Sequence, residues 1–284
     1  MSDASRNTHI HIEARTGLLN VDLQEIWRYR DLILLFTKRS FALTYKQTIL
    51  GPAWILLNPF ITSVIYTIVF GGIAGISTGG IPQILFYMGN NAVWSFFAAC
   101  LTRTSSTFTA NAGVFGKVYF PRLTVPVSTV LSAGITFFIQ FLMLSFFWVY
   151  FLMRGDIRPH WGLLPLILPI LLQLGCLGLG TGIIVSSLTT KYRDLSFLVG
   201  FGVQLWMYGT PVVYPMGQIE SPLLRNVVHV NPVTQAVETF RYIFMGTGEV
   251  SLFWWMVSIV MTLCILVLGV LLFNQVEKTF MDTV

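Results

Sequence analysis

Hydrophobic residues in this chain gather in long runs, with short polar segments between them. Six runs reach the roughly 20 mostly apolar residues that a membrane-spanning helix requires. They lie at residues 53–74, 84–101, 127–152, 163–188, 195–214 and 253–273. Pro211 and Pro215 interrupt the fifth run, and the second continues as a helix into the polar stretch 102–109. The pattern predicts an all-α integral membrane protein with six transmembrane helices.

Residues 1–52 form a polar, basic leader that contains an amphipathic helix. Asp22 and Glu25 have the spacing of a capping box, which favours a helix start. Apolar residues then recur at helical spacing, and they are Leu23, Ile26, Trp27, Ile33 and Leu34. Basic residues lie between and after them. Such a helix lies in the plane of the membrane interface, and a plain surface anchor explains the pattern equally well. We therefore expect a cytosolic leader over 1–52 and a six-span transmembrane domain over 53–284.

The segment between the fifth and sixth runs, residues 215–252, is too long for a turn and too polar to span a membrane. Asn231 and Pro232 have the character of a helix start. Val233, Val237, Phe240 and Phe244 follow on one helical face. We predict one or two short helices that lie at the outer leaflet or re-enter it; an ordinary interfacial loop is the alternative.

Charge is scarce and unevenly placed. Only 10% of residues are charged and 55% are hydrophobic, and the mean hydropathy is +0.73, whereas soluble domains carry about 25% charged residues. Of the 17 Lys and Arg residues, 13 lie in the leader, the second and fourth connections and the tail. This bias places both termini in the cytosol. It also accounts for the net charge of +5 without a nucleic-acid partner.

The six runs contain no Asp, Glu, Lys, Arg or His. Proton-coupled carriers usually keep such residues at membrane depth, so proton coupling is disfavoured, while Na⁺ coupling stays open. The segment from Gly113 to Lys117 imitates a phosphate-binding loop, but it has two residues between its glycines where four are required. Val118 follows the lysine in place of Ser or Thr. We expect no metal, cofactor or catalytic site in this chain, and any ATP must be bound by a partner.

Polar and aromatic side chains form two stripes within the runs. They are Asn58, Thr62, Tyr66 and Phe70 on the first run, and Gln204 and Tyr208 on the fifth. Amides and hydroxyls are costly against lipid, so they should face protein or water. Amides beside aromatic rings suit a carbohydrate, which offers hydroxyls and apolar ring faces. Hydrogen bonding and packing between helices is an equal alternative.

Two pairs of glycines have the spacing that allows helices to approach closely. They are Gly71 with Gly75 and Gly178 with Gly182. Small residues four positions apart let the backbones of membrane helices come into contact. We expect these pairs to serve packing within the bundle rather than a contact between subunits.

Four stretches, in order along the chain, resemble a known family. They are residues 29–59 with Tyr45–Trp54 at their centre, Gly89–Phe97, Asn111–Arg122, and Tyr192-Arg193-Asp194 through Pro215 to Asn231-Pro232. The chain resembles permease subunits of ABC-2 type exporters, most of all those that export lipid-linked polysaccharides such as O-antigen or teichoic acid. One departure is Leu43-Thr44, where that family often has a basic residue.

The resemblance implies a homodimer paired with two copies of a separate ATPase subunit that binds ATP and Mg²⁺. The complex would lie in the bacterial cytoplasmic (inner) membrane. The substrate would be a lipid-linked glycan, exported through a channel at the dimer seam that the two stripes line and the outer helices gate. Contacts with the ATPase would come from Arg30, Lys38, Arg39, Lys117, Tyr119, Phe120, Pro121, Arg122, Arg193 and Asp194. Gly51 and Pro52 would form the hinge between the leader helix and the first span.

Three other functions remain open at this point. An ABC-2 exporter of a small lipid or drug would have the same fold and partner. A membrane-embedded enzyme would need a catalytic group on the outer side, where the candidates are Asp156, His160, Glu220, His229 and Glu238. A secondary carrier is disfavoured by the missing intramembrane charges and by the absence of a visible repeat.

Overall fold

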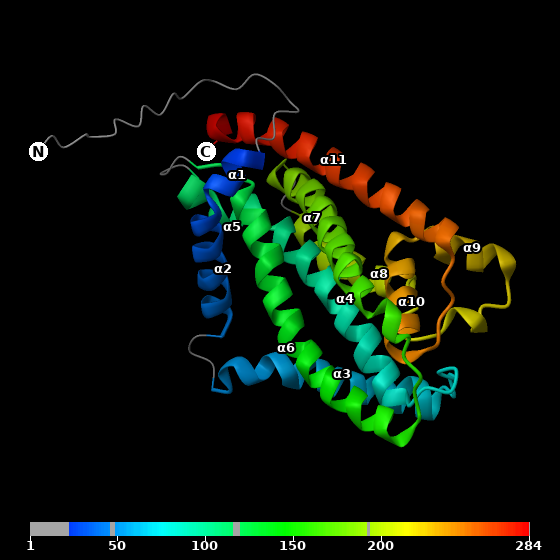
Figure 1. The fold of residues 1–284 in the computed structure, drawn as a ribbon. Coiled ribbons are helices and arrows are strands. Elements are labelled where there is room, and N and C mark those ends of the chain that lie inside the picture. The colour runs from blue at the N-terminus through cyan, green and yellow to red at the C-terminus, as the bar shows by residue number, and fades with distance from the viewer. Residues whose placement is uncertain (1–22, 46–48, 116–119, 192–193, 284) are drawn as a thin grey trace, which may run out of the picture.

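The computed structural model describes residues 23–45, 49–115, 120–191 and 194–283, and all regular secondary structure in these segments is helical (Figure 1). The α-helices are α1 Leu23–Arg28, α2 Arg30–Tyr45, α3 Trp54–Tyr66, α4 Gln83–Ser105, α5 Thr107–Phe115, α6 Thr124–Arg154, α7 Ile167–Lys191, α8 Leu195–Tyr208, α9 Pro222–Val230, α10 Pro232–Met245 and α11 Leu252–Thr283. Short 3₁₀ helices lie at Gly51–Ala53 (η1), Trp161–Leu166 (η3) and Met216–Gln218 (η4), and a π-helix lies at Thr67–Ile73 (η2).

Five helical segments in the described part of the chain are long and apolar enough to cross a membrane. They are Gly51–Ile73, Gln83–Ser105, Thr124–Arg154, Trp161–Thr190 and Leu252–Val276. Five of the six predicted spans are thereby confirmed in position. The second extends further than predicted, because α4 continues to Ser105. Arg103, which the sequence places in a connection, therefore lies in the last turn of a candidate span.

The fifth predicted run, 195–214, forms only the 14-residue helix α8, about 21 Å long at 1.5 Å per residue. The hydrocarbon core of a bilayer is about 30 Å thick, so a straight span through residue 214 is wrong. The physical cause is Pro211, which lacks a backbone N–H and disfavours helical geometry in the residue before it. The chain turns at this point, and the Val212 N–H donates to the Thr210 carbonyl at 2.7 Å.

The two ends of the bundle differ in what they carry. At one end, here called the proximal end, α1 and α5 lie near the last turns of α11 (Figure 1). An apolar cluster at this end includes Phe36 of α2, Phe108 of α5, Phe120 and Phe273 of α11. At the other, the distal end, α9 and α10 lie beside the start of α11. The first and last described helices therefore meet at the same end of the molecule.

The core is built around α4, which packs against α3, α6, α7, α8 and α10. Gly178 and Gly182 of α7 face α4 so closely that a Cβ on Gly182 would lie 2.8 Å from the Leu101 carbonyl oxygen. Their predicted role in packing within the bundle is confirmed. Gly71 and Gly75 behave differently from the prediction: Gly71 faces the Gln83 side chain, and Gly75 lies beyond the helix with a φ of 65°.

The segment between α8 and α11 contains two helices, as the sequence predicts. The Asn231 side chain caps α10 by accepting a hydrogen bond from the Val233 N–H at 3.1 Å, and Pro232 occupies the first turn. The predicted apolar face of α10 is buried, but so is nearly all of its opposite face. Because α10 packs against α4, α7 and α11, it is enclosed by protein.

Candidate functional site

The first stripe follows α3 and enters the π-helix η2. The Thr62 hydroxyl donates to the Asn58 carbonyl of its own helix at 2.8 Å. The Asn58 side chain is exposed. Further along, the Tyr66 ring lies 5.5 Å from Phe70 and 6.1 Å from Tyr87 of α4. The stripe thus begins at an open polar position and ends in a cluster of aromatic rings.

The second stripe lies on the open face of α8. Phe197, Phe201, Gln204 and Tyr208 share this face at helical spacing and are all exposed. Met207, on the other side of the helix, is buried, and its sulfur accepts a hydrogen bond from the Tyr66 hydroxyl at 3.6 Å. The first stripe therefore contacts α8 at Met207, on the side of the helix opposite the predicted second stripe.

Asn231 joins the end of α8 to the start of α10. Its Oδ1 accepts a hydrogen bond from the Trp206 indole N–H at 2.9 Å, and its Nδ2 donates to the Gly209 carbonyl and the Thr210 hydroxyl at 3.0 and 2.8 Å. In addition, the Asn90 amide of α4 donates to the Val212 carbonyl at 3.0 Å. Sequence reasoning identified Asn231 as a helix start but missed this second role.

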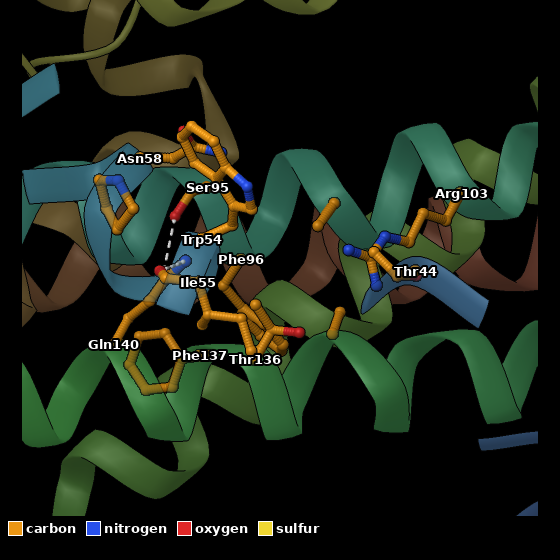
Figure 2. Close-up of a pocket in the computed structure, with 13 residues that line it drawn as sticks. Thr44, Trp54, Ile55, Asn58, Ser95, Phe96, Arg103, Thr136, Phe137 and Gln140 are labelled. Atoms are coloured by element: carbon orange, nitrogen blue, oxygen red, sulfur yellow. Dashed lines mark hydrogen bonds between the residues drawn. The ribbon is translucent and has the colours of Figure 1, made fainter. Parts of the chain in front are cut away.

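A cavity of about 400 Å³ lies between α2, α3, α4 and α6, with Asn58 on its wall (Figure 2). Ser95 of α4 donates to the Gln140 side-chain oxygen of α6 at 3.3 Å, and the Gln140 amide donates to the Ile55 carbonyl at 3.4 Å. The Ile55 carbonyl lacks its helical donor, because the residue four positions on is Pro59. Gln140 was missed at the sequence level, although an amide at the centre of a 26-residue apolar run was a usable signal.

The predicted ATPase-coupling residues lie at the proximal end. Phe120, ahead of α6, packs between Phe36 of α2 and Phe115 of α5, with ring centroids 5.6 and 5.9 Å apart. Arg122 lies over the Phe115 ring at 5.6 Å. The leader helix and the α5–α6 connection therefore share one apolar cluster, although they are far apart in sequence.

The remaining coupling residues occupy different environments. Lys38 and Arg39 are exposed on α2, and Arg30 lies over the Trp27 ring at 6.0 Å. Asp194 caps α8 by accepting from the Leu195 N–H at 3.1 Å. Pro121 is half-buried beside Phe120. Lys117, Tyr119 and Arg193, and the capping residue Asp22 of the leader, lie outside the described residues.

Several titratable groups at the distal end, including Glu238, His229 and His160, are engaged in structural contacts. Glu238 forms an ion pair with Arg241 and accepts from the Glu249 N–H at 2.9 Å. His229 stacks on Trp254 with ring centroids 5.4 Å apart. Burial, together with the nearby charge of Arg225, lowers the pKa of His229 below its usual value. His160 likewise stacks on Tyr242, at 4.1 Å. These contacts hold helices together rather than assembling a catalytic pair.

Comparison with known proteins adds the family. Residues 31–245 match the family described as ABC-2 type transporter. Two proteins from Klebsiella pneumoniae, each named O-antigen export system permease protein RfbA, are 27% identical to this chain over 256 and 255 residues, or 89% of this chain and 94% of each relative. A protein of the same name from Myxococcus xanthus is 26% identical over 225 residues, 78% of this chain and 83% of that relative. With five membrane-length helices and a family match over most of its length, this chain is a multi-pass membrane permease that belongs to the ABC-2 type transporter family.

Proposed function

We propose that this protein is the transmembrane subunit of an ATP-driven exporter that moves a lipid-linked polysaccharide across the bacterial cytoplasmic membrane. The observation that carries the proposal is the exposed stripe of amide and aromatic side chains on α8, a helix whose buried side contacts the stripe on α3. Exposed amides are unfavourable against lipid, so this face requires water, protein or a polar substrate. The names of the relatives, which refer to O-antigen export, support a glycan.

The proposed topology has six crossings and both termini in the cytosol. The first and last described helices meet at the proximal end, and a chain whose ends lie on one side must cross a membrane an even number of times. Five long helices supply an odd number, so α8 makes the sixth crossing. Its short length is extended by the turn at Gly209–Val213, which Asn90 and Asn231 hold. In this arrangement α9 and α10 re-enter from the outer side.

The channel is proposed to form between two copies of the chain. The α8 face with Phe197, Phe201, Gln204 and Tyr208 has no cover within the described residues. A second copy related by a two-fold axis would place the same stripe opposite it, as closed dimers require. The gap between the two stripes would then hold the glycan, with hydroxyls on the amides and sugar faces on the rings.

Energy is proposed to enter at the proximal end from two copies of a separate ATPase subunit. The support is the shared cluster of Phe36, Phe115 and Phe120, which ties α2 to the connection ahead of α6. A push on either element would be transmitted to the other, because packed side chains do not compress. From α2 the motion would pass through the corner at Gly51 and Pro52 into α3.

Reconstitution tests this proposal. The chain is purified with a candidate ATPase subunit from the same organism and placed in vesicles, and export of a fluorescent lipid-linked glycan is measured together with ATP hydrolysis. Tyr208→Ala and Gln204→Ala should each lower export at least tenfold while ATP hydrolysis persists. Leu168→Ala, on an exposed apolar face of α7, is the matched control and should export normally. Unchanged glycan export in both stripe variants contradicts the proposal, and lost transport of a small lipid or drug would favour that substrate class instead.

A further inference from the structure

The cavity between α2, α3, α4 and α6 is lined by one basic residue and by no acidic residue among those that the structure describes. Thirteen residues line it, and Arg103 is its only charged side chain (Figure 2). Arg103 extends from the last turn of α4 toward Thr44 at the end of α2, as Figure 2 shows. It is half-buried. None of the described residues that line the cavity is acidic, so Arg103 faces this space without a counter-charge from them.

Three hydrogen-bond donors on the wall have no acceptor among the residues that the structure describes. They are the Arg103 guanidinium, the Asn58 amide and the Trp54 indole N–H, none of which has a recorded hydrogen bond. A guanidinium alone carries five N–H donors. By contrast, the hydroxyls of Thr44 and Thr136 donate to carbonyls of their own helices at 2.9 and 3.2 Å. The cavity therefore offers positive charge and free N–H donors, together with the Thr44, Thr136 and Asn58 side-chain oxygens, which can still accept.

A cation at the end of a helix has a simpler explanation, which is its attraction to the negative end of the helix dipole. That effect accounts for the position of Arg103 in the last turn of α4. It does not supply acceptors for the guanidinium, and it does not involve Asn58 or Trp54 on the neighbouring helix α3. A cation that faces a cavity without an acceptor among the described residues points to an anionic ligand.

The chemical class of the ligand follows from the surroundings. The cavity opens at Thr44, Trp54 and Asn58, which are all exposed, and its remaining wall includes Ile55, Phe96 and Phe137. An anion with several oxygens attached to an apolar chain would satisfy both parts of the wall. Guanidinium groups bind phosphates through paired hydrogen bonds. We propose that this cavity binds the phosphate group of a lipid, with Arg103 as the principal ligand.

The phosphate could belong to a membrane phospholipid or to a polyprenyl phosphate carrier, since both present the same group on an apolar chain. The proposal needs only a bilayer and a free cavity. It is therefore independent of the proposed export function: a failure to bind lipid would leave glycan export untested, and a failure to export would leave lipid binding untouched.

Lipid retention by the purified full-length chain tests the site. Native mass spectrometry measures how much of each lipid stays bound. Phosphatidylglycerol is compared with diacylglycerol, and a polyprenyl phosphate is compared with polyprenol, so that each control lacks only the phosphate-containing group. The wild-type chain should retain at least one of the two phosphate lipids about tenfold more strongly than the matched alcohol. A roughly tenfold difference is the scale of one charge-assisted hydrogen bond. Stronger retention of the polyprenyl phosphate assigns the site to the carrier, stronger retention of phosphatidylglycerol assigns it to membrane phospholipid, and equal retention means that the site recognises the phosphate on either lipid.

Two variants separate this site from general attraction of lipids to basic residues. Arg103→Gln should abolish the preference for phosphate, whereas Arg154→Gln should leave it unchanged, because Arg154 occupies the last turn of α6 outside the cavity. Arg103→Lys should keep part of the preference and guards against a misfolded Gln variant. The proposal is overturned if the wild-type chain retains alcohols as strongly as phosphates, if it retains neither, as it would if a second copy covered the cavity, or if Arg103→Gln binds like the wild type.

Discussion

Several amide side chains in this bundle form hydrogen bonds with backbone groups that have no partner within their own helix. Gln140 donates to the Ile55 carbonyl that Pro59 leaves without a helical partner, and Asn231 binds the last turn of α8 while capping α10. An unpaired carbonyl in a membrane is costly, since no water replaces the missing donor. Amides at such places are therefore structural, and only the exposed ones on the stripes are free to contact substrate.

Replacing Asn231 with alanine should destabilise the α8–α10 junction. The loss of a helix cap and of the bonds to Trp206 and Gly209 amounts to roughly 2–3 kcal/mol. Asn231→Asp should cost less, because it keeps the oxygen that accepts from Trp206 and caps α10. Thermal unfolding of the purified chain in detergent measures both. Asn226→Ala, on the exposed side of α9, is the control, and equal melting temperatures for the two alanine variants would contradict this role.

The packing of α9 and α10 at the distal end should become less stable as the pH falls. Burial holds the pKa of His229 below its usual value, and nearby Arg225 lowers it further while Glu249 opposes the shift. Neutral His229 accepts a hydrogen bond from the Gln235 amide at 2.9 Å. Its stabilising effect is complete above the unfolded-state pKa of about 6.5 and is lost as the pH falls from there toward the folded-state pKa.

Hydrogen exchange in α9 and α10 checks this expectation. Exchange should rise between pH 7.5 and pH 5.5 after correction for the intrinsic rate. His229→Gln, which cannot gain a proton, should show a smaller rise. If both proteins show the same pH dependence, His229 is not the group that senses pH.

At the scale of elements, close contact between helices depends on single glycines. Gly182 on α7 should not tolerate even a methyl group, because a Cβ there would lie 2.8 Å from the Leu101 carbonyl oxygen of α4. Gly182→Ala must move one helix, at a cost of about 1–3 kcal/mol. Gly200→Ala on α8, where no atom lies within 4 Å of the added carbon, should be neutral or slightly stabilising. Melting temperatures that fall equally would show that the α4–α7 contact is not the cause.

The corner between the leader helix and α3 depends on the conformation of Gly51. Its φ of 51° lies in the left-handed region, which costs other L-residues roughly 1–2 kcal/mol. Space is not the obstacle, since an added Cβ meets no atom within 4 Å. Gly51→Ala should therefore fold but lower glycan export relative to ATP hydrolysis, and Gly51→Asn should be milder. Gly162→Ala, at an unstrained and uncrowded glycine, is the control; normal coupling in Gly51→Ala would exclude the corner as a hinge.

For the whole molecule, the open face of α8 predicts where two copies meet. In a background with Cys100, Cys176 and Cys264 replaced by alanine, Phe201→Cys and Gln204→Cys should form a disulfide-linked dimer on oxidation in membranes. Leu168→Cys is similarly exposed but lies on α7, and it should remain monomeric on denaturing gels. Monomers at both α8 positions, or efficient linkage at Leu168, would place the subunit contact elsewhere.

Helix positions were largely predictable because membrane length and apolar runs are local properties. Five spans and the helix start at Asn231-Pro232 follow directly from the residues. The shortening of α8 was also encoded, in Pro211, yet the run of apolar residues on both sides hid it. The environments of Gln140 and Arg103 were not predictable, since each depends on a partner or a cavity contributed by other helices.

By itself the sequence determined the class of molecule: apolar runs without charge can be stable only in a membrane, and their lengths set the helices. It also determined which glycines and prolines interrupt or join those helices. Tertiary structure alone decided that the α3 stripe contacts the buried side of α8 at Met207, that the leader helix shares a cluster with Phe120, and that Arg103 faces a cavity. Periodicity assigns a residue to a face of its own helix, whereas the neighbour of that face is chosen by packing among all the helices together.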